Sequence, residues 1–412
     1  MRGDDPRQPW MPQIALLENP IREYDWGSRT AIAELLGRPV PSAAPQAELW
    51  MGAHPSAPSS VQLPGGGRSL LSWIQERPQE LLGSRVQAKF EGRLPFLMKV
   101  LAADRPLSIQ AHPDAAQALE GFARENAAGI PLDARERCYR DASHKPELLC
   151  ALTPFWALRG FRAPREILSL VAKLAVPELD VAAECLRTGA EREALSAWLR
   201  GLFALAPEAR VRLVRAAARA AAECADDDVA FEWIGRLQQL RCDDVGVLAP
   251  LFLHAVRLEP GEAIFLPARE LHAYLQGVGV ELMASSDNVL RGGLTSKPLA
   301  VAELLRCLRF EPARPSLLRA PLDPSGWERY ATPALEFELA RTALRDGSSL
   351  ASATERGIEI LLCTEGQIEL TPADSRTSVR LAQGASCIVP AAVGAYRASG
   401  RGMLYRASVP LA

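Results

Sequence analysis

Histidine is scarce in this chain, which contains only five among 412 residues. Eight cysteines are present, but no two form a C-x-x-C pair, so neither a thiolate zinc site nor a disulfide framework is indicated. No apolar run reaches the roughly 18 residues that a membrane span needs. The formal net charge is -2. Such a balance gives no overall field that would attract nucleic acid or an anionic membrane, and we expect neither as a partner.

The first residues, 1–6, lack the apolar stretch of a signal peptide, so we expect a cytoplasmic location. Hydrophobic residues make up 48% and charged residues 23% of the chain, as in an ordinary globular protein. A chain of this length allows two or three domains, each with its own core.

The character of the sequence changes twice along the chain. The phrase LPFLMKVL at residues 94–101 is typical of a buried strand, and short strands with Gly and Pro breaks surround it. From Pro164 onward the chain is rich in Ala, Leu, Arg and Glu, and Ile167, Leu170 and Val171 begin a helical spacing that Leu174 completes. Short strands return at about residue 251. We therefore predict a mainly β protein with an inserted α-helical domain.

Two phrases have a Gly, five further residues and a Pro, at Gly261 to Pro267 and at Gly384 to Pro390. This spacing is a feature of cupin barrels, so the sequence favours two cupin (jelly-roll) barrels plus a helical domain. His272 follows Pro267 by five residues, and no histidine occurs after it. The second barrel is therefore expected to bind no metal. The predicted domains are a catalytic cupin formed by 14–155 with 251–310, a helical domain at 156–250, and a metal-free cupin-like barrel at 311–412.

Four residues form a candidate metal site. Gln110 and His112 are two apart, so on a strand their side chains point to the same face. Glu147 would add a carboxylate and His272 a second imidazole. Two nitrogen and two oxygen ligands suit Zn²⁺ with an open position, although the ligand types also admit Fe²⁺, Mn²⁺ and Co²⁺. A Gln-x-His pair alone is more often structural, so the assignment depends on a longer match.

That longer match is a resemblance to the type I mannose-6-phosphate isomerases (phosphomannose isomerases), which are zinc-dependent cupins. Its phrases include YDWGS at 24–28, AELWMGAHP at 47–55, LSIQAHPD at 107–114, HKPE at 144–147 and ASSDNVLRGGLTSK at 284–297. The resemblance is colinear over about residues 14–310. One departure is Arg269, where the generic cupin pattern has Gly.

The resemblance implies a function and a set of site residues. The reaction would interconvert mannose 6-phosphate and fructose 6-phosphate through a cis-enediol, with one Zn²⁺ per chain. The family's metal ligands carry over as Gln110, His112, Glu147 and His272, and its catalytic arginine as Arg291. A sugar phosphate is then the expected small-molecule partner. We expect a monomer or a weak homo-oligomer.

The reaction also needs a base for the C2 proton and an anchor for the phosphate. Glu281, Lys145 and His54 are candidates for the base, and we favour Glu281 or Lys145. The residue types that fit the phosphate are Ser108, Lys99 and Lys297, and Arg291 could serve both the phosphate and the reacting oxygens. We also expect Trp26 and Glu48 to line the cavity.

Two other functions are compatible with parts of the pattern. Two His and one carboxylate match the iron triad of a metal-dependent cupin oxygenase, but the extra Gln110 and the cations suited to phosphate argue against it. A non-catalytic sugar-binding cupin is the second alternative. The presence of Arg291 together with all four predicted ligands argues against it.

Overall fold

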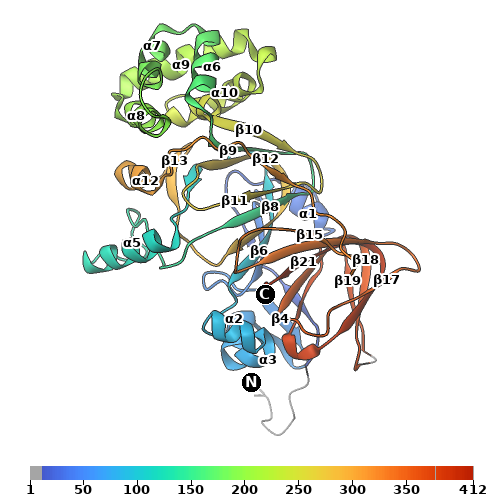
Figure 1. The fold of residues 1–412 in the computed structure, drawn as a ribbon. Coiled ribbons are helices and arrows are strands. Elements are labelled where there is room, and N and C mark those ends of the chain that lie inside the picture. Colours follow the sequence, from blue (N-terminus) through green and yellow to red (C-terminus); the bar gives the residue numbers. More distant parts are fainter. Residues whose placement is uncertain (1–11, 376, 412) are drawn as a thin grey trace.

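The computed structural model describes residues 12–375 and 377–411 (Figure 1). The residues at the amino terminus on which we based the expected cytoplasmic location lie outside this range, and that location stays a prediction. Over the described residues, the search for a helix with the length and hydropathy of a membrane span finds none.

The first of two antiparallel sheets carries most of the predicted site residues. Its strands run in the order β14-β11-β8-β12-β6-β3-β2, with β7, β9, β10 and β13 attached beside this path. The strands are β2 (Ile21–Arg22), β3 (Glu48–Gly52), β6 (Phe96–Ala103), β7 (Ile109–Ala111), β8 (Glu147–Ala151), β9 (Phe155–Phe161), β10 (Leu253–Leu258), β11 (Ala263–Leu266), β12 (His272–Ala284), β13 (Leu290–Gly293) and β14 (Leu317–Leu318).

The second sheet combines both ends of the chain. Its order is β15-β16-β21-β18-β20-β1-β4-β5, with β17 on β21 and β19 on β18. The strands are β1 (Ala15–Glu18), β4 (Ser60–Leu63), β5 (Gly66–Ser69), β15 (Glu328–Tyr330), β16 (Glu338–Leu344), β17 (Ser349–Ala351), β18 (Glu359–Pro372), β19 (Val379–Ala382), β20 (Ser386–Val389) and β21 (Tyr396–Ser408). The early strand β1 pairs with the late strand β20, so the amino-terminal segment is built into this sheet.

The helical segment is an insertion between two paired strands. β9 leads into it and β10 leads out, and these two strands pair antiparallel. Its helices gather at one end of the molecule (Figure 1). They are α6 (Pro164–Leu174), α7 (Pro177–Ala182), η1 (Ala183–Leu186), α8 (Glu191–Ala204), α9 (Pro207–Glu223), η2 (Ala225–Asp227), α10 (Val229–Leu240), η3 (Val245–Leu248) and α11 (Ala249–Phe252). The predicted apolar stripe of α6 is buried in the helical core, as its spacing requires.

The expectation of a mainly β protein is wrong, because the chain is 31% strand and 30% helix. Helices also occur outside the insertion: α1 (Ala31–Leu35), α2 (Leu70–Glu76), α3 (Pro78–Leu82), α4 (Ser84–Lys89), α5 (Ala115–Ala127), α12 (Val301–Cys307) and η4 (Ala391–Val393). The longest of them, α5, begins at a capping box in which Asp114 and Gln117 exchange hydrogen bonds. The two sheets are not closed, so the expected cupin barrels are not confirmed.

Alternation along the strands of the first sheet separates a core face from a polar face. Met98, Val100 and Leu282 pack in one buried cluster with Ile360 and Leu362 of the second sheet. The residues between them on β6 and β12 point to the opposite face, because successive side chains on a strand alternate. This opposite face holds the candidate site.

Candidate active site and metal centre

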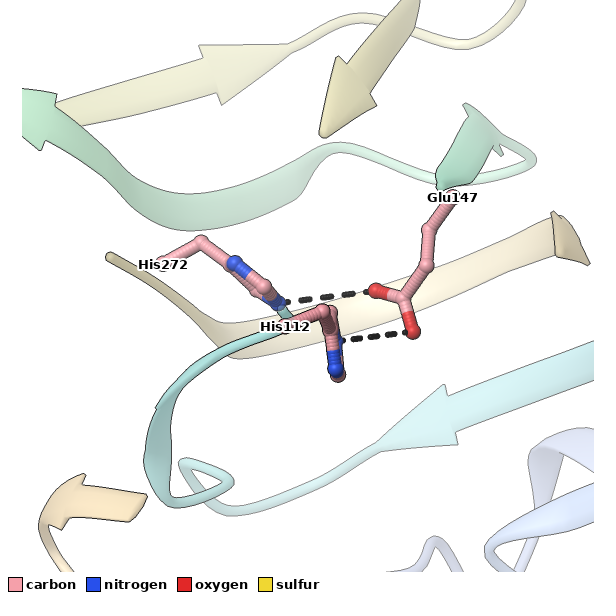
Figure 2. A group of neighbouring side chains, drawn as sticks. All are labelled: His112, Glu147 and His272. Atoms are coloured by element: carbon pink, nitrogen blue, oxygen red, sulfur yellow. Dashed lines mark ion pairs between the residues drawn. The ribbon is translucent and has the colours of Figure 1, made fainter. Parts of the chain in front are cut away.

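Glu147, the first residue of β8, lies between two histidines (Figure 2). Its Oε1 is 3.2 Å from Nε2 of His112, and its Oε2 is 3.5 Å from Nε2 of His272. One ligand atom from each residue lies within 4.8 Å of the others. The three side chains are no more than 2% exposed. Residues 112, 147 and 272, far apart in sequence, therefore form one buried cluster.

The hydrogen bonds of both imidazoles leave Nε2 free as an electron-pair donor. Nδ1 of His112 lies 2.6 Å from the carbonyl oxygen of Asn288, and Nδ1 of His272 lies 3.1 Å from that of Glu270. A carbonyl can only accept, so each neutral ring carries its hydrogen on Nδ1. Both Nε2 atoms and Oε2 of Glu147 are buried, and they have no hydrogen-bond partner among residues 12–375 and 377–411.

The protonation states make this cluster a fit for a divalent cation. Burial lowers the pKa of His112 to about 4, although the charge of Glu147 opposes the shift. Burial favours the neutral form of Glu147, but the nearby Lys145 and His112 outweigh it and hold the pKa of Glu147 well below its usual range. At neutral pH an ionised carboxylate then faces imidazole lone pairs. Such an arrangement is repulsive unless a cation lies between the groups, and nitrogen and oxygen donors of this kind suit Zn²⁺.

Gln110 lies beside this cluster on β7. In the strand register it is opposite His272 of β12 and opposite Arg291 of β13. Its side chain is half-buried and lines the adjacent cleft. These positions are compatible with a fourth ligand, and the role of Gln110 stays a prediction.

A cleft of about 760 Å³ opens over the polar face of the first sheet. His112 and His272 are buried beneath it. The other predicted site residues all line it: Trp26, Glu48, Lys99, Ser108, Gln110, Lys145, Glu147, Glu281, Arg291 and Lys297. The structure therefore brings every residue that we selected from the sequence to one place.

A row of buried charges crosses the cleft floor from β3 to β12. Nζ of Lys99 is 2.9 Å from Oε2 of Glu281 and 3.3 Å from Oε1 of Glu48. Trp50 donates its indole N–H to Glu48 at 2.9 Å and lies under the Lys99 ammonium. Burial would lower the pKa of Lys99, but the carboxylates of Glu281 and Glu48 raise it above its usual range. Burial raises the pKa of Glu281, although the ammonium of Lys99 opposes that shift.

The other side of the cleft carries cations. Lys145 Nζ is 3.0 Å from Oε1 of Glu147, so this ammonium adjoins the metal-binding cluster. Within residues 12–375 and 377–411, no ion pair joins a carboxylate to Arg291, Lys297 or Arg140. Burial lowers the pKa of Lys297, and the charges of Arg291 and Arg140 add to the effect. Arg291 and Lys297 therefore bring positive charge to the cleft that no carboxylate of the described residues neutralises.

Known proteins share this sequence and this fold. A family model described as the catalytic domain of type I phosphomannose isomerase matches residues 14–164. The mannose-6-phosphate isomerase of Escherichia coli K12 is 40% identical over 393 residues, covering 95% of this chain and 98% of the relative. The human enzyme of the same name is 34% identical over 409 residues, covering 90% and 92%.

The chain belongs to the type I phosphomannose isomerases. Solved structures agree. A variant of phosphomannose isomerase from Salmonella typhimurium superimposes with a TM-score of 0.88 at 37% identity, covering 97% of this chain and 100% of that chain. A zinc-bound mannose 6-phosphate isomerase superimposes with a TM-score of 0.87 at 38% identity and the same coverage.

Sequence reasoning missed several residues around the site of this family member. Leu237 and Arg241 of the helical segment line the cleft, and nothing in their local sequence indicated it. Tyr274 also lines the cleft, and a signal for it existed, because it is two residues after His272 on the same strand. Arg269, the departure from the cupin pattern, has φ +70°, a conformation that favours glycine. Its backbone N–H donates to the carbonyl of His112 at 2.7 Å, which explains why the chain turns there.

Replacing His272 should remove both metal binding and activity. We expect His272→Ala to bind Zn²⁺ at least about tenfold more weakly, because an imidazole ligand is lost and Glu147 stays buried. The measurement is metal content after dialysis, together with a chelator competition titration. The matched control is His254→Ala on β10, outside the cluster, which should retain both properties. Wild-type zinc affinity in the first variant would exclude His272 as a ligand.

Proposed function

We propose that this protein interconverts mannose 6-phosphate and fructose 6-phosphate with one Zn²⁺ per chain. The observation that carries the proposal is the buried cluster of His112, Glu147 and His272 beneath a cleft whose rim holds unpaired cations. An oxygenase would need the cluster but not these cations. A non-catalytic sugar-binding protein would not need the row formed by Glu48, Lys99 and Glu281. Membership of the isomerase family favours the same choice.

The proposed metal ligands are Gln110, His112, Glu147 and His272. A zinc ion bound there would supply a Lewis acid and a template for the oxygens of the open-chain sugar. The carbonyls of Asn288 and Glu270 fix the orientation of the two imidazoles. The protein therefore presents the donor atoms in advance of binding.

Proton transfer is assigned to Glu281. Starting from mannose 6-phosphate, its carboxylate takes the proton from C2, and the C2–H electron pair forms the C1=C2 bond of the enediol as the C1=O π pair moves to O1. The O2 hydroxyl proton passes to O1, the carbonyl forms at C2, and Glu281 returns its proton to C1. Burial raises the pKa of Glu281, which strengthens it as a base. The strand register places Glu281 two residues from Met283, which is opposite Glu147. Base and metal ligands thus share one face of the sheet.

Two cations would stabilise the negative charge that develops on the substrate oxygens. Lys145 adjoins Glu147 at the edge of the cluster, and Arg291 projects from the strand beside β7. Fixed positive groups in a desolvated site lower the energy of an enediolate without reorganising. We therefore propose Lys145 and Arg291 as catalytic residues. His54, the third candidate for the base, also lines the cleft, and its Nε2 lies 3.5 Å from Oδ1 of Asp287.

The phosphate is assigned to the cationic side of the cleft. Ser108, Lys297 and Arg291 line this cleft, and no carboxylate among the described residues pairs with either cation. Lys99 is already matched by two carboxylates, so we propose that it contacts the sugar and orients Glu281. Trp26 and Glu48 would complete the wall around the substrate. Binding energy from the phosphate can then position C1 and C2 over the base.

We also propose a division of the chain that follows the predicted one. Residues 14–155 and 251–310 would form a catalytic cupin-type unit, 156–250 a helical domain, and 311–412 a metal-free cupin-like unit, to whose sheet the strands β1, β4 and β5 of the first range also belong. The repeated Gly-to-Pro phrases at 261–267 and 384–390 support this division, since the first contains β11 of the first sheet and the second contains β20 of the second sheet. A monomer or weak homo-oligomer is the proposed assembly.

The direct test is a coupled assay of purified, zinc-loaded protein with mannose 6-phosphate. We expect formation of fructose 6-phosphate, its loss after chelation, and its recovery when Zn²⁺ is returned. Oxygen uptake in the same sample should not exceed the baseline. Zinc-loaded, folded protein that forms no fructose 6-phosphate would disprove the isomerase function, and oxygen consumption would support the oxygenase.

Removing the proposed base should lower kcat. Glu281→Gln keeps the shape of the side chain but cannot accept the C2 proton, so we expect kcat to fall by about 10²- to 10⁴-fold. Zinc content should stay at one per chain, because Glu281 is not a ligand. Glu281→Asp keeps a carboxylate and should recover part of the lost rate. A kcat for Glu281→Gln within a factor of three of wild type would assign the base elsewhere.

Removing a phosphate-binding cation should weaken substrate binding. A hydrogen bond to a charged group contributes about 1.5–3 kcal/mol, so Lys297→Met should raise KM for mannose 6-phosphate about tenfold to a hundredfold. The rate measured with unphosphorylated mannose at the same concentrations should change much less. Lys173→Met, at an exposed position on α6, is the matched control. Equal losses with both sugars would argue against a phosphate contact.

A further inference from the structure

A single buried amide connects the elements that carry the metal cluster. Asn288 lies in the segment between β12 and β13 and is completely buried. Its side-chain oxygen accepts the backbone N–H of Arg140 at 2.7 Å and that of Asp141 at 3.3 Å. Its side-chain nitrogen donates to the carbonyls of Asp141 at 2.8 Å and Ser143 at 2.9 Å.

These partners use the full capacity of the amide. A primary amide offers two donor hydrogens and two acceptor lone pairs, and each finds a backbone partner here. Only one orientation of the group is possible, since a flip would place N–H against N–H and oxygen against oxygen. The amide therefore holds residues 140–143 at fixed distances from Asn288. This segment leads directly into Lys145 and Glu147.

The backbone of Asn288 reaches the metal cluster from the other side. Its carbonyl accepts the Nδ1 hydrogen of His112 at 2.6 Å, and its N–H donates to Ser286 Oγ at 3.2 Å. Ser286 Oγ in turn bonds the carboxylate of Asp141 at 2.9 Å. Arg291, which belongs to β13, follows Asn288 by three residues in the chain. Asn288 thus bonds His112 and the segment that precedes Glu147, and it precedes the strand that carries Arg291.

We infer that Asn288 is a positioning residue that sets the mutual orientation of His112 and Glu147, and with it the metal geometry. The inference rests on the proposed function, because it concerns the same zinc site. Loss of the side-chain amide would free residues 140–143 and shift the Asn288 carbonyl that fixes the imidazole. Loss of partners behind the metal ligands typically lowers metal affinity or activity by about 10- to 100-fold.

The test compares three variants in chelator competition for Zn²⁺ and in the visible spectrum of the Co²⁺-substituted protein. Asn288→Asp keeps the volume and the acceptor oxygen but loses both donors and faces the Asp141 carboxylate. We expect about 10- to 100-fold weaker zinc binding and an altered Co²⁺ spectrum. Asn126→Asp is the control, because the Asn126 oxygen only accepts from Arg137 and lies outside the cluster. It should match wild type.

A second variant keeps the inference testable if Asn288→Asp does not fold. Ser286→Ala leaves the amide in place and removes the hydroxyl that links Asn288 to Asp141 and that also lies 3.2 Å from the carbonyl oxygen of Ser143. A smaller shift of the same sign is therefore expected. Wild-type affinity and spectrum in every folded variant at these two positions would overturn the inference while leaving the isomerase proposal intact. Wild-type protein that binds no Zn²⁺ would instead overturn the proposed function.

Discussion

The site depends on three buried acceptor atoms that lie close together: Nε2 of His112, Nε2 of His272 and Oε2 of Glu147. Nε2 of His112 and Nε2 of His272 face the carboxylate of Glu147, and within the described residues neither nitrogen nor Oε2 of Glu147 has a hydrogen-bond partner. Leaving polar atoms in this state costs several kcal/mol unless a cation occupies the space between them. Each ring is held from behind by a backbone carbonyl, so rotation cannot relieve the conflict. The fold therefore holds these atoms in positions where a bound cation would offset the cost of burying them.

Alternation along β6 and β12 lets one sheet serve both as core and as active site. Met98 and Leu282 face the second sheet, while their neighbours Lys99 and Glu281 face the cleft and pair with each other. A slip of one residue in the β6–β12 register would exchange these faces and bury Lys99 in the apolar core. The long antiparallel pairing from Phe96 to Ala103 prevents such a slip. Fold stability and charge placement are therefore set by the same pairing.

How far the sequence could predict this site depended on the range of the interactions. The spacing of Gln110 and His112 indicated a shared face, and the stripe on α6 was confirmed. The approach of His272 to Glu147 is a long-range pairing that no local pattern contains, and only the family resemblance supplied it. The equal helix content was missed because α1 to α4 are short and lack a long apolar period. Asn288 was missed because its partners are backbone groups of a distant loop.

The second sheet helps to define the site although the expected second barrel has no histidine. It covers the apolar face of the first sheet, and Tyr330 donates to the carbonyl of Gly261 at 2.6 Å, in the turn that leads into β11. Glu336 binds His144 at 2.7 Å, one residue before Lys145. Both contacts come from the carboxy-terminal segment and end on elements that carry site residues. The carboxy-terminal segment therefore helps to hold the elements of the first sheet that carry the site residues.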